Sequence, residues 1–155
     1  QGMHTRIYLS MAFGNPYKED WNNKILLNWA TQLTDLGVSE LVLSDTVGVA
    51  NEKSISSAYS ILNSHLPDTI LSAHFHSTSD TWKSKIKAGE ASGCTSFDSA
   101  ILGKGGCPMA EDELVGNIAT ENLIRHFKGK LGEYFNEDEF VKSLIMANTI
   151  FSKYH

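Results

Sequence analysis

Short apolar runs alternate with longer amphipathic segments along the 155 residues of this chain. The short runs have the length of buried strands, whereas the longer segments repeat apolar residues with the 3.6-residue period of a helix. The runs predict strands at residues 6–11, 40–44, 69–73 and 95–99. The longer segments predict helices at residues 19–36, 52–66, 80–92, 120–127 and 137–153. This alternation is typical of a parallel sheet with right-handed crossovers.

Two of the predicted helices carry an apolar stripe that we expect to face the core. The stripe of the helix at residues 19–36 comprises Trp21, Ile25, Trp29, Leu33 and Leu36. The stripe of the last helix comprises Phe140, Leu144, Ala147 and Phe151. Gly37 and Pro67 mark the expected ends of the first two helices, because neither residue continues a helix well.

Two histidines stand at the carboxyl end of the third predicted strand, in the sequence His74-Phe75-His76. Because successive strand residues point to opposite faces, His74 and His76 project from the same face. Two imidazoles that converge in this way can hold a divalent metal ion and leave coordination positions open for a substrate. Polar residues at a strand end also occur where they only bond neighbours or water. The motif alone leaves both interpretations open.

A glycine-rich loop follows the fourth predicted strand, in the sequence Gly103-Lys104-Gly105-Gly106-Cys107-Pro108. Glycine lets the backbone approach a ligand closely, and Pro108 stiffens the chain after Cys107. The thiol is therefore a candidate reactive group, although an ordinary turn with a small apolar cysteine fits the same letters. Asn117 precedes the helix at residues 120–127, where it serves either as a helix cap or as an oxygen ligand for a metal.

Five short motifs, taken in order, resemble those of the hydroxymethylglutaryl-CoA lyases of the DRE-TIM metallolyase superfamily. The motifs are Leu43-Ser44-Asp45-Thr46-Val47-Gly48-Val49, His74-Phe75-His76, Phe97-Asp98-Ser99, Gly105-Gly106-Cys107-Pro108 and Gly116-Asn117-Ile118-Ala119-Thr120-Glu121. The resemblance runs from about residue 7 to about residue 127 and implies the carboxy-terminal half of the family's TIM barrel. Length agrees, because a complete barrel needs at least ~200 residues. We therefore expect an α/β fold of parallel (β/α) units, forming half a TIM barrel in one partial domain over residues 1–155.

The resemblance also implies a role for each candidate residue. His74, His76 and Asn117 would be ligands of a divalent metal, Mg2+ or Mn2+, that chelates oxygens of a hydroxy-acyl-CoA substrate. Cys107 would close over the substrate on its loop and assist proton transfer. Asp45 would belong to the proton-transfer network, although a turn or cap role fits its position too, and His76 could also carry a proton. The implied reaction cleaves hydroxymethylglutaryl-CoA to acetoacetate and acetyl-CoA.

Three departures from the family pattern change this expectation. Ser77 stands where the family has an aspartate directly after the second histidine, and the acidic segment at residues 109–115 is longer than the family's. The family's first-strand Asp-Arg pair, which supplies a further metal ligand and a cation for the developing enolate charge, lies outside the 155 residues. We therefore expect the chain alone to bind metal weakly and not to turn over.

Two other functions stay open at this point. A condensing enzyme of the same superfamily, such as an isopropylmalate or homocitrate synthase, would share the fold, although the Gly-Gly-Cys-Pro loop is not expected there. A non-catalytic assembly module built on a half-barrel belongs to a different functional class. Because a half-barrel leaves two strand edges unpaired, we expect the missing amino-terminal half, or a second copy in a homodimer, to cover them.

Composition excludes some classes of partner. The net charge is −5 and Lys and Arg do not cluster, so nucleic acid and anionic membranes are not expected partners. The sequence has neither an apolar run long enough for a membrane span nor a signal-peptide pattern at its start. Cys94 and Cys107 form no disulfide framework, which favours a reducing, cytoplasmic location, and Cys94 fits a packed position. We expect Gln1-Gly2-Met3 to be a cloning scar.

Overall fold

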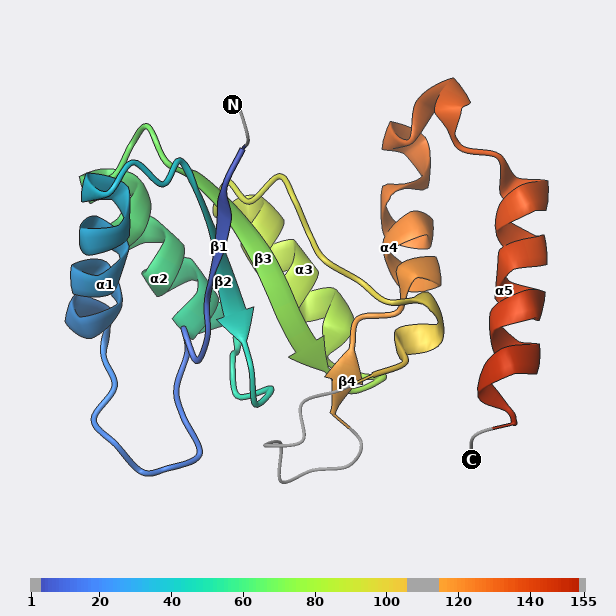
Figure 1. Ribbon diagram of the computed structural model, residues 1–155, viewed down its shortest axis with the longest axis horizontal. Helices are drawn as coiled ribbons and strands as arrows, with labels where there is room; N and C mark the ends of the chain where they lie inside the picture. The colour runs from blue at the N-terminus through green and yellow to red at the C-terminus, as the bar shows by residue number, and fades with distance from the viewer. Residues whose placement is uncertain (1–3, 106–114, 154–155) are drawn as a thin grey trace.

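Strands and helices alternate along the chain in the computed structural model, which describes residues 4–105 and 115–153 (Figure 1). The strands are β1 (Arg6–Leu9), β2 (Glu40–Asp45), β3 (Ile70–Ser77) and β4 (Gly116–Asn117). The helices are α1 (Asn23–Asp35), α2 (Glu52–His65), α3 (Trp82–Ala91), α4 (Thr120–Phe127) and α5 (Glu137–Phe151). The predicted helices are all present, and the bounds of α2 to α5 agree with the predicted ones to within two residues.

The described strands form one sheet in the order β1-β2-β3-β4. Strands β1, β2 and β3 are parallel, so their carboxyl ends meet at one edge of the sheet. Strand β4 pairs antiparallel with the end of β3, where His76 lies opposite Asn117. Helices α1, α2 and α3 cover one face of this sheet, and α4 and α5 lie beyond its β4 edge (Figure 1).

The hydrophobic core lies between the sheet and the helices α1 to α3. Alternate residues of β2 point into it, because strand side chains alternate between faces. Leu41 and Leu43 of β2 are fully buried there. The same buried cluster contains Phe75 of β3 and, from the helices, Leu26, Ala30, Ile55, Tyr59, Leu62 and Ile86. The opposite face of the sheet consequently carries the other alternate set, which includes His74 and His76.

The fourth predicted strand, residues 95–99, is present only as an extended segment with one parallel bridge, between Ala73 and Phe97. Two hydrogen bonds hold it beside β3: the Ala73 amide donates to the Ser96 carbonyl, and the Asp98 amide donates to the Ala73 carbonyl. The segment stops following β3 at Ala100, whose amide donates to the Ile118 carbonyl instead. The ladder is therefore too short for a regular strand, but it still brings Asp98 beside the histidines.

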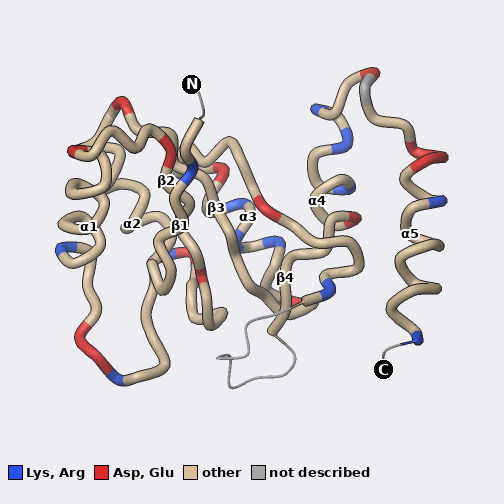
Figure 2. The backbone as a smooth tube through the Cα atoms, viewed as in Figure 1, with Lys and Arg blue, Asp and Glu red and all other residues tan. Residues whose placement is uncertain are grey.

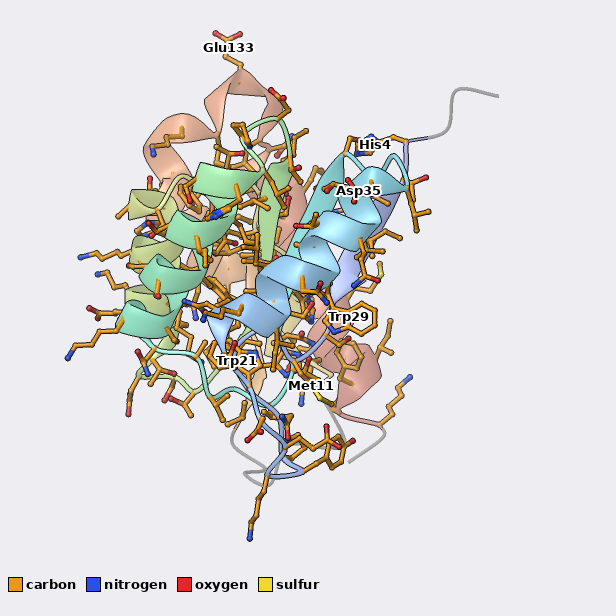
Figure 3. The ribbon with its side chains drawn as sticks, turned by 90° about the vertical axis from the view of Figure 1, so that its left-hand side faces the viewer. His4, Met11, Trp21, Trp29, Asp35 and Glu133 are labelled. Atoms are coloured by element: carbon orange, nitrogen blue, oxygen red, sulfur yellow. The ribbon has the colours of Figure 1, made fainter. Side chains whose placement is uncertain are left out.

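The predicted stripe of α1 is wrong for three of its residues. Ile25, Trp29 and Leu36 are exposed, Trp29 to 57% and Leu36 to 82%, and Figure 3 shows Trp29 projecting from α1 on the side away from α2. The buried residues of the helix are Leu26 and Ala30. The helix also begins later than predicted, at Asn23, because the Asn22 side chain accepts hydrogen bonds from the amides of residues 24 and 25.

The cause is that α1 carries two overlapping apolar stripes. Leu26, Ala30 and Leu33 repeat with helical spacing just as Ile25 and Trp29 do. Helical periodicity cannot choose between them, whereas packing against α2 and the sheet selects the first set. The prediction for α5 is confirmed in part: Phe140, Leu144, Ala147 and Phe151 are its half-buried positions, but none of its described residues is fully buried.

Charged residues are spread over several elements of the fold (Figure 2). Cys94 is buried, which confirms its predicted packed position. Among the described residues, no helix has both the length and the apolar character that crossing a membrane requires.

Candidate metal centre

His74 and His76 converge at the carboxyl end of β3. Both side chains leave the same face of the strand, and their ring centroids lie 5.1 Å apart. The two Nε2 atoms are separated by 3.2 Å. Two imidazole nitrogens that share one ion at about 2.1 Å each lie roughly this far apart when they occupy neighbouring coordination positions. The arrangement therefore fits two ligands of a single divalent ion.

Asp98 stands behind His74. Its Oδ2 atom lies 3.3 Å from His74 Nδ1, and it also accepts a hydrogen bond of 2.8 Å from the Tyr8 hydroxyl. Arg6 Nη2 lies 3.2 Å from the other carboxylate oxygen. A carboxylate beside one ring nitrogen holds the proton there and leaves the other nitrogen free as a ligand. Asp98 thus orients His74 with its Nε2 atom toward His76.

The contacts of Asp98 with β1 also change the pKa of Tyr8. The hydrogen bond from the Tyr8 hydroxyl to Asp98, together with burial and the negative charge of that carboxylate, raises the pKa of Tyr8. The phenol therefore keeps its proton and stays a donor to Asp98. Tyr8 in addition meets His74 ring edge to ring face, at 5.9 Å between centroids.

His76 is more deeply buried than His74. Burial lowers the pKa of His76, and the neighbouring His74 lowers it further, because both disfavour a charged ring. Neutral imidazole is the form that binds metal ions. Within the described part of the chain, the Nδ1 atom of His76 is buried without a hydrogen-bond partner. The two histidines therefore differ in how they are held, since only His74 has a carboxylate behind its ring.

Asn117 lies directly opposite His76 in the antiparallel β3–β4 pair. Residues paired in this way carry their side chains on the same face of the sheet. The Asn117 Nδ2 atom donates to the carbonyl oxygens of Lys104 and Gly105, each at 3.1 Å. With its nitrogen held there, the amide offers Oδ1 as its acceptor atom. The cap role considered for Asn117 does not apply, because the residue before α4 that takes the cap position is Ala119.

Asp45 lies on the other face of the sheet from the two histidines. It pairs in register with Phe75 and is only 1% exposed, on the side covered by helices. Its Oδ2 accepts a 2.6 Å bond from Lys85 Nζ, and its Oδ1 accepts from the Ala50 amide at 2.9 Å. The structure therefore matches the turn position that was the alternative for Asp45. Its catalytic role stays a prediction, and Cys107 lies outside the described residues.

The described residues contain no group of three or more histidine, cysteine, aspartate or glutamate side chains that could surround an ion. The candidate centre therefore rests on the two imidazole nitrogens, with the Asn117 amide oxygen, opposite His76 in the β3–β4 pair, as the third predicted ligand. This donor set fits a divalent ion that accepts mixed nitrogen and oxygen ligation and keeps further positions open.

Comparison with known proteins identifies the family. A family model described as HMGL-like matches residues 3–145. The chain belongs to the HMGL-like family. It is 36% identical over 120 residues to the hydroxymethylglutaryl-CoA lyase YngG of Bacillus subtilis, a match that covers 77% of this chain and 40% of that protein. It is 32% identical over 128 residues to the (R)-citramalyl-CoA lyase of Chloroflexus aurantiacus, covering 83% and 40%.

The crystal structure of the Bacillus subtilis HMG-CoA lyase superposes with a TM-score of 0.75 at 34% identity, covering 82% of this chain and 42% of that one. The predicted resemblance and the predicted α/β fold of TIM-barrel type are thereby confirmed. The chain spans about two fifths of the length of the relatives it matches. This HMGL-like chain therefore corresponds to part of the barrel.

Sequence reasoning missed three residues of the HMGL-like site region: Asp98, Tyr8 and Lys85. Asp98 lies in one of the motifs that carry the resemblance, but the motif does not reveal its partner. Arg6 and Tyr8 occupy alternate positions of the first strand, whose other residues are apolar. Such alternation signals a strand with one polar face, here the inner face of the sheet. Nothing in the sequence pointed to Lys85, because a lysine in an amphipathic helix is usually solvent-exposed.

Proposed function

We propose that this chain supplies half of the active site of a metal-dependent carbon–carbon lyase, which in the complete protein cleaves hydroxymethylglutaryl-CoA to acetoacetate and acetyl-CoA. The observation that carries the proposal is the 3.2 Å separation of the His74 and His76 Nε2 atoms at the carboxyl edge of the sheet. Ligands bind at this edge in barrels of parallel strands. Membership of the HMGL-like family supports the same reaction class.

The proposed ligands are His74, His76 and Asn117, and the proposed ion is Mg2+ or Mn2+. When bound, the ion supplies Lewis-acid chemistry by polarising the oxygen atoms of a hydroxy-acyl thioester. The chain prepares its ligands in three ways. Asp98 holds the His74 ring, burial lowers the pKa of His76 and so favours its neutral ring, and the carbonyls of residues 104 and 105 hold the Asn117 amide.

Cleavage also requires removal of the hydroxyl proton and delivery of a proton to the acetyl-CoA enolate. We assign Cys107 to this proton transfer on a loop that closes over the substrate, with His76 as a further member of the network. Asp45, the third predicted member, is left out of the proposal, because it faces the helices and both of its carboxylate oxygens are bonded to Lys85 and Ala50. The start of that loop supports the assignment, because Gly105 and Lys104 are bonded to Asn117. The loop therefore begins at the candidate metal centre.

The citramalyl-CoA lyase relative supports a second candidate substrate. Both relatives are named as lyases of CoA thioesters, and the candidate centre described above does not distinguish their acyl groups. Assaying the complete protein with both thioesters decides between them. The proposed partners of the chain are an acyl-CoA substrate and the remaining half of the barrel, supplied by the amino-terminal half or by a second copy. The chain by itself is expected to be inactive.

Calorimetric titration with Mn2+ tests the proposed centre. The wild-type chain is expected to bind Mn2+ weakly, and the His74→Ala/His76→Ala variant is expected to lose that binding. His65→Ala is the matched control, because His65 is an exposed histidine at the end of α2, away from the centre. Absence of binding by the wild-type chain, or equal binding by the double variant, would overturn the proposal.

The assignment of Cys107 requires the complete protein. Cys107→Ala there is expected to lower turnover strongly while leaving the affinity for Mn2+ unchanged, since the thiol moves protons and does not bind the ion. Cys94→Ala is the comparison, because Cys94 is buried in the core. Equal turnover of wild type and Cys107→Ala would remove Cys107 from the mechanism.

A further inference from the structure

Lys85 of α3 is a buried lysine, 3% exposed, on the helix-covered side of the sheet. Its Nζ atom donates three hydrogen bonds: to Asp45 Oδ2 at 2.6 Å, to the His76 carbonyl at 2.7 Å and to the Gly48 carbonyl at 3.0 Å. An ammonium group has three donors and no acceptor. Every donor of Lys85 is therefore used, which is what a buried charge requires.

The three acceptors come from separate segments. Asp45 ends β2, Gly48 lies in the turn between β2 and α2, and His76 lies near the end of β3. Asp45 also accepts from the Ala50 amide, so the carboxylate closes the turn on one side and meets Lys85 on the other. One side chain thus joins the carboxyl ends of two neighbouring strands directly behind the candidate metal centre.

The bond to His76 has a particular consequence because the two candidate ligands are held differently. The His74 ring has Asp98 behind its Nδ1 atom. The His76 ring has no partner at Nδ1 among the described residues. The backbone of His76 is held by the bond from Lys85 to its carbonyl, together with its pairing opposite Asn117 of β4.

We propose that Lys85 is a positioning residue for His76: by anchoring the His76 carbonyl to the end of β2, it sets where the imidazole stands on the inner face and keeps its Nε2 atom against that of His74. Lys85 does not touch the candidate ion and acts through the strand backbone. The inference rests on the proposed metal centre for its functional meaning. The geometric part, which concerns the approach of the two rings, applies to the metal-free chain as well.

The test needs a variant that folds. Lys85→Met alone would leave the Asp45 carboxylate buried without its cation, which is strongly destabilising. The test variant is therefore Asp45→Asn/Lys85→Met, which removes both charges. Asp45→Asn alone also costs stability, because it leaves the Lys85 ammonium group without its counter-charge, but it keeps Lys85 and its bonds to the two carbonyls. Lys87→Met is the matched control, because Lys87 is an exposed lysine of the same helix.

The first measurement is made without metal. A nuclear Overhauser effect between the ring protons of His74 and His76 reports their approach, and one between Tyr8 and His74 serves as an internal reference. The wild type, Asp45→Asn and Lys87→Met are expected to show both effects. Asp45→Asn/Lys85→Met is expected to lose the first effect and keep the second. A folded double variant with the wild-type effect between the histidines would overturn the proposal, as would loss of that effect in a folded Asp45→Asn variant.

The second measurement is Mn2+ titration of the same four proteins. Losing a group that orients a ligand typically lowers metal affinity 10- to 100-fold. We therefore expect Asp45→Asn/Lys85→Met to bind Mn2+ at least about tenfold more weakly than Asp45→Asn. Equal Mn2+ affinities of these two variants would show that Lys85 does not position His76. If the wild type itself does not bind Mn2+, the proposed function fails, while the metal-free comparison still decides the role of Lys85.

Discussion

Tyr8 and Asp98 are separated by 90 residues in the sequence, yet the Tyr8 hydroxyl donates a 2.8 Å hydrogen bond to Asp98 Oδ2. Tyr8 belongs to β1, and Asp98 to the extended segment on the far side of β3. The contact therefore spans the inner face of the sheet over β2 and β3. It requires a curved sheet, and it fixes the carboxylate that stands 3.3 Å from His74 Nδ1.

Asp98→Asn is expected to weaken Mn2+ binding by about tenfold or more, because an amide does not hold the His74 proton at Nδ1 as a carboxylate does. Calorimetric titration of the chain measures the effect. Asp68→Asn, at an exposed position before β3, is the control and should bind as the wild type does. Equal affinities of Asp98→Asn and wild type would show that the carboxylate does not orient His74.

Glu40 is expected to make stability depend on pH in the acid range. The Ser72 hydroxyl, which donates to Glu40 Oε1 at 2.6 Å, lowers the pKa of Glu40, and the hydrogen bond with His4 and the charge of Arg6 lower it further. Since the pKa is lower in the folded state, the stabilisation is complete above the unfolded pKa of about 4.3 and is lost as the pH falls through the folded value.

Urea unfolding of wild type and Glu40→Gln between pH 7 and pH 3 measures this dependence. Glu40→Gln should be less stable at pH 7, and the difference in the free energy of unfolding should shrink as the pH falls below about 4. A difference that stays constant over the whole range would show that the Glu40 charge contributes nothing to stability.

Gly89→Ala is expected to destabilise the chain, although alanine is normally favoured over glycine inside a helix by about 1 kcal/mol. A Cβ atom at residue 89 of α3 would lie 2.9 Å from Cε1 of Phe97 and 3.3 Å from Cε2 of Phe75. Overpacking of this kind costs about 1–3 kcal/mol, so the clash outweighs the propensity. Gly129→Ala is the control, because nothing lies within 4 Å of a Cβ there. In thermal unfolding, Gly89→Ala should melt at a lower temperature than the wild type, and Gly129→Ala at a higher one.

Two neighbouring residues of α1 test which of its stripes is buried. Leu26→Ala is expected to lower the free energy of unfolding by about 2–5 kcal/mol, because it empties a buried site. Ile25→Ala should cost much less, since Ile25 is 36% exposed. Chemical denaturation of both variants measures the two costs. A larger loss of stability in Ile25→Ala than in Leu26→Ala would show that the stripe predicted from periodicity is the buried one.

Local patterns predicted the elements of this fold well, because they follow from backbone geometry over a few residues. Strand alternation alone places His74 and His76 on one face, and the predicted bounds of α4 agree with the structure. The residues between β3 and α4 were predicted less well. The segment at residues 95–99 follows β3 for only two hydrogen bonds, and no local signal shows where it turns toward Ile118.

The amino-acid sequence by itself determined the α/β class, the family and the pair of histidines that defines the candidate centre. Only the tertiary structure decided which stripe of α1 is buried, that Asp45 faces the helices, and that Asp98 and Lys85 contact the two histidines. The physical reason is the range of the interactions. Periodicity is set by neighbours in the chain, whereas these contacts join residues 9 to 90 positions apart, and they depend on how the sheet curves and which face the helices cover.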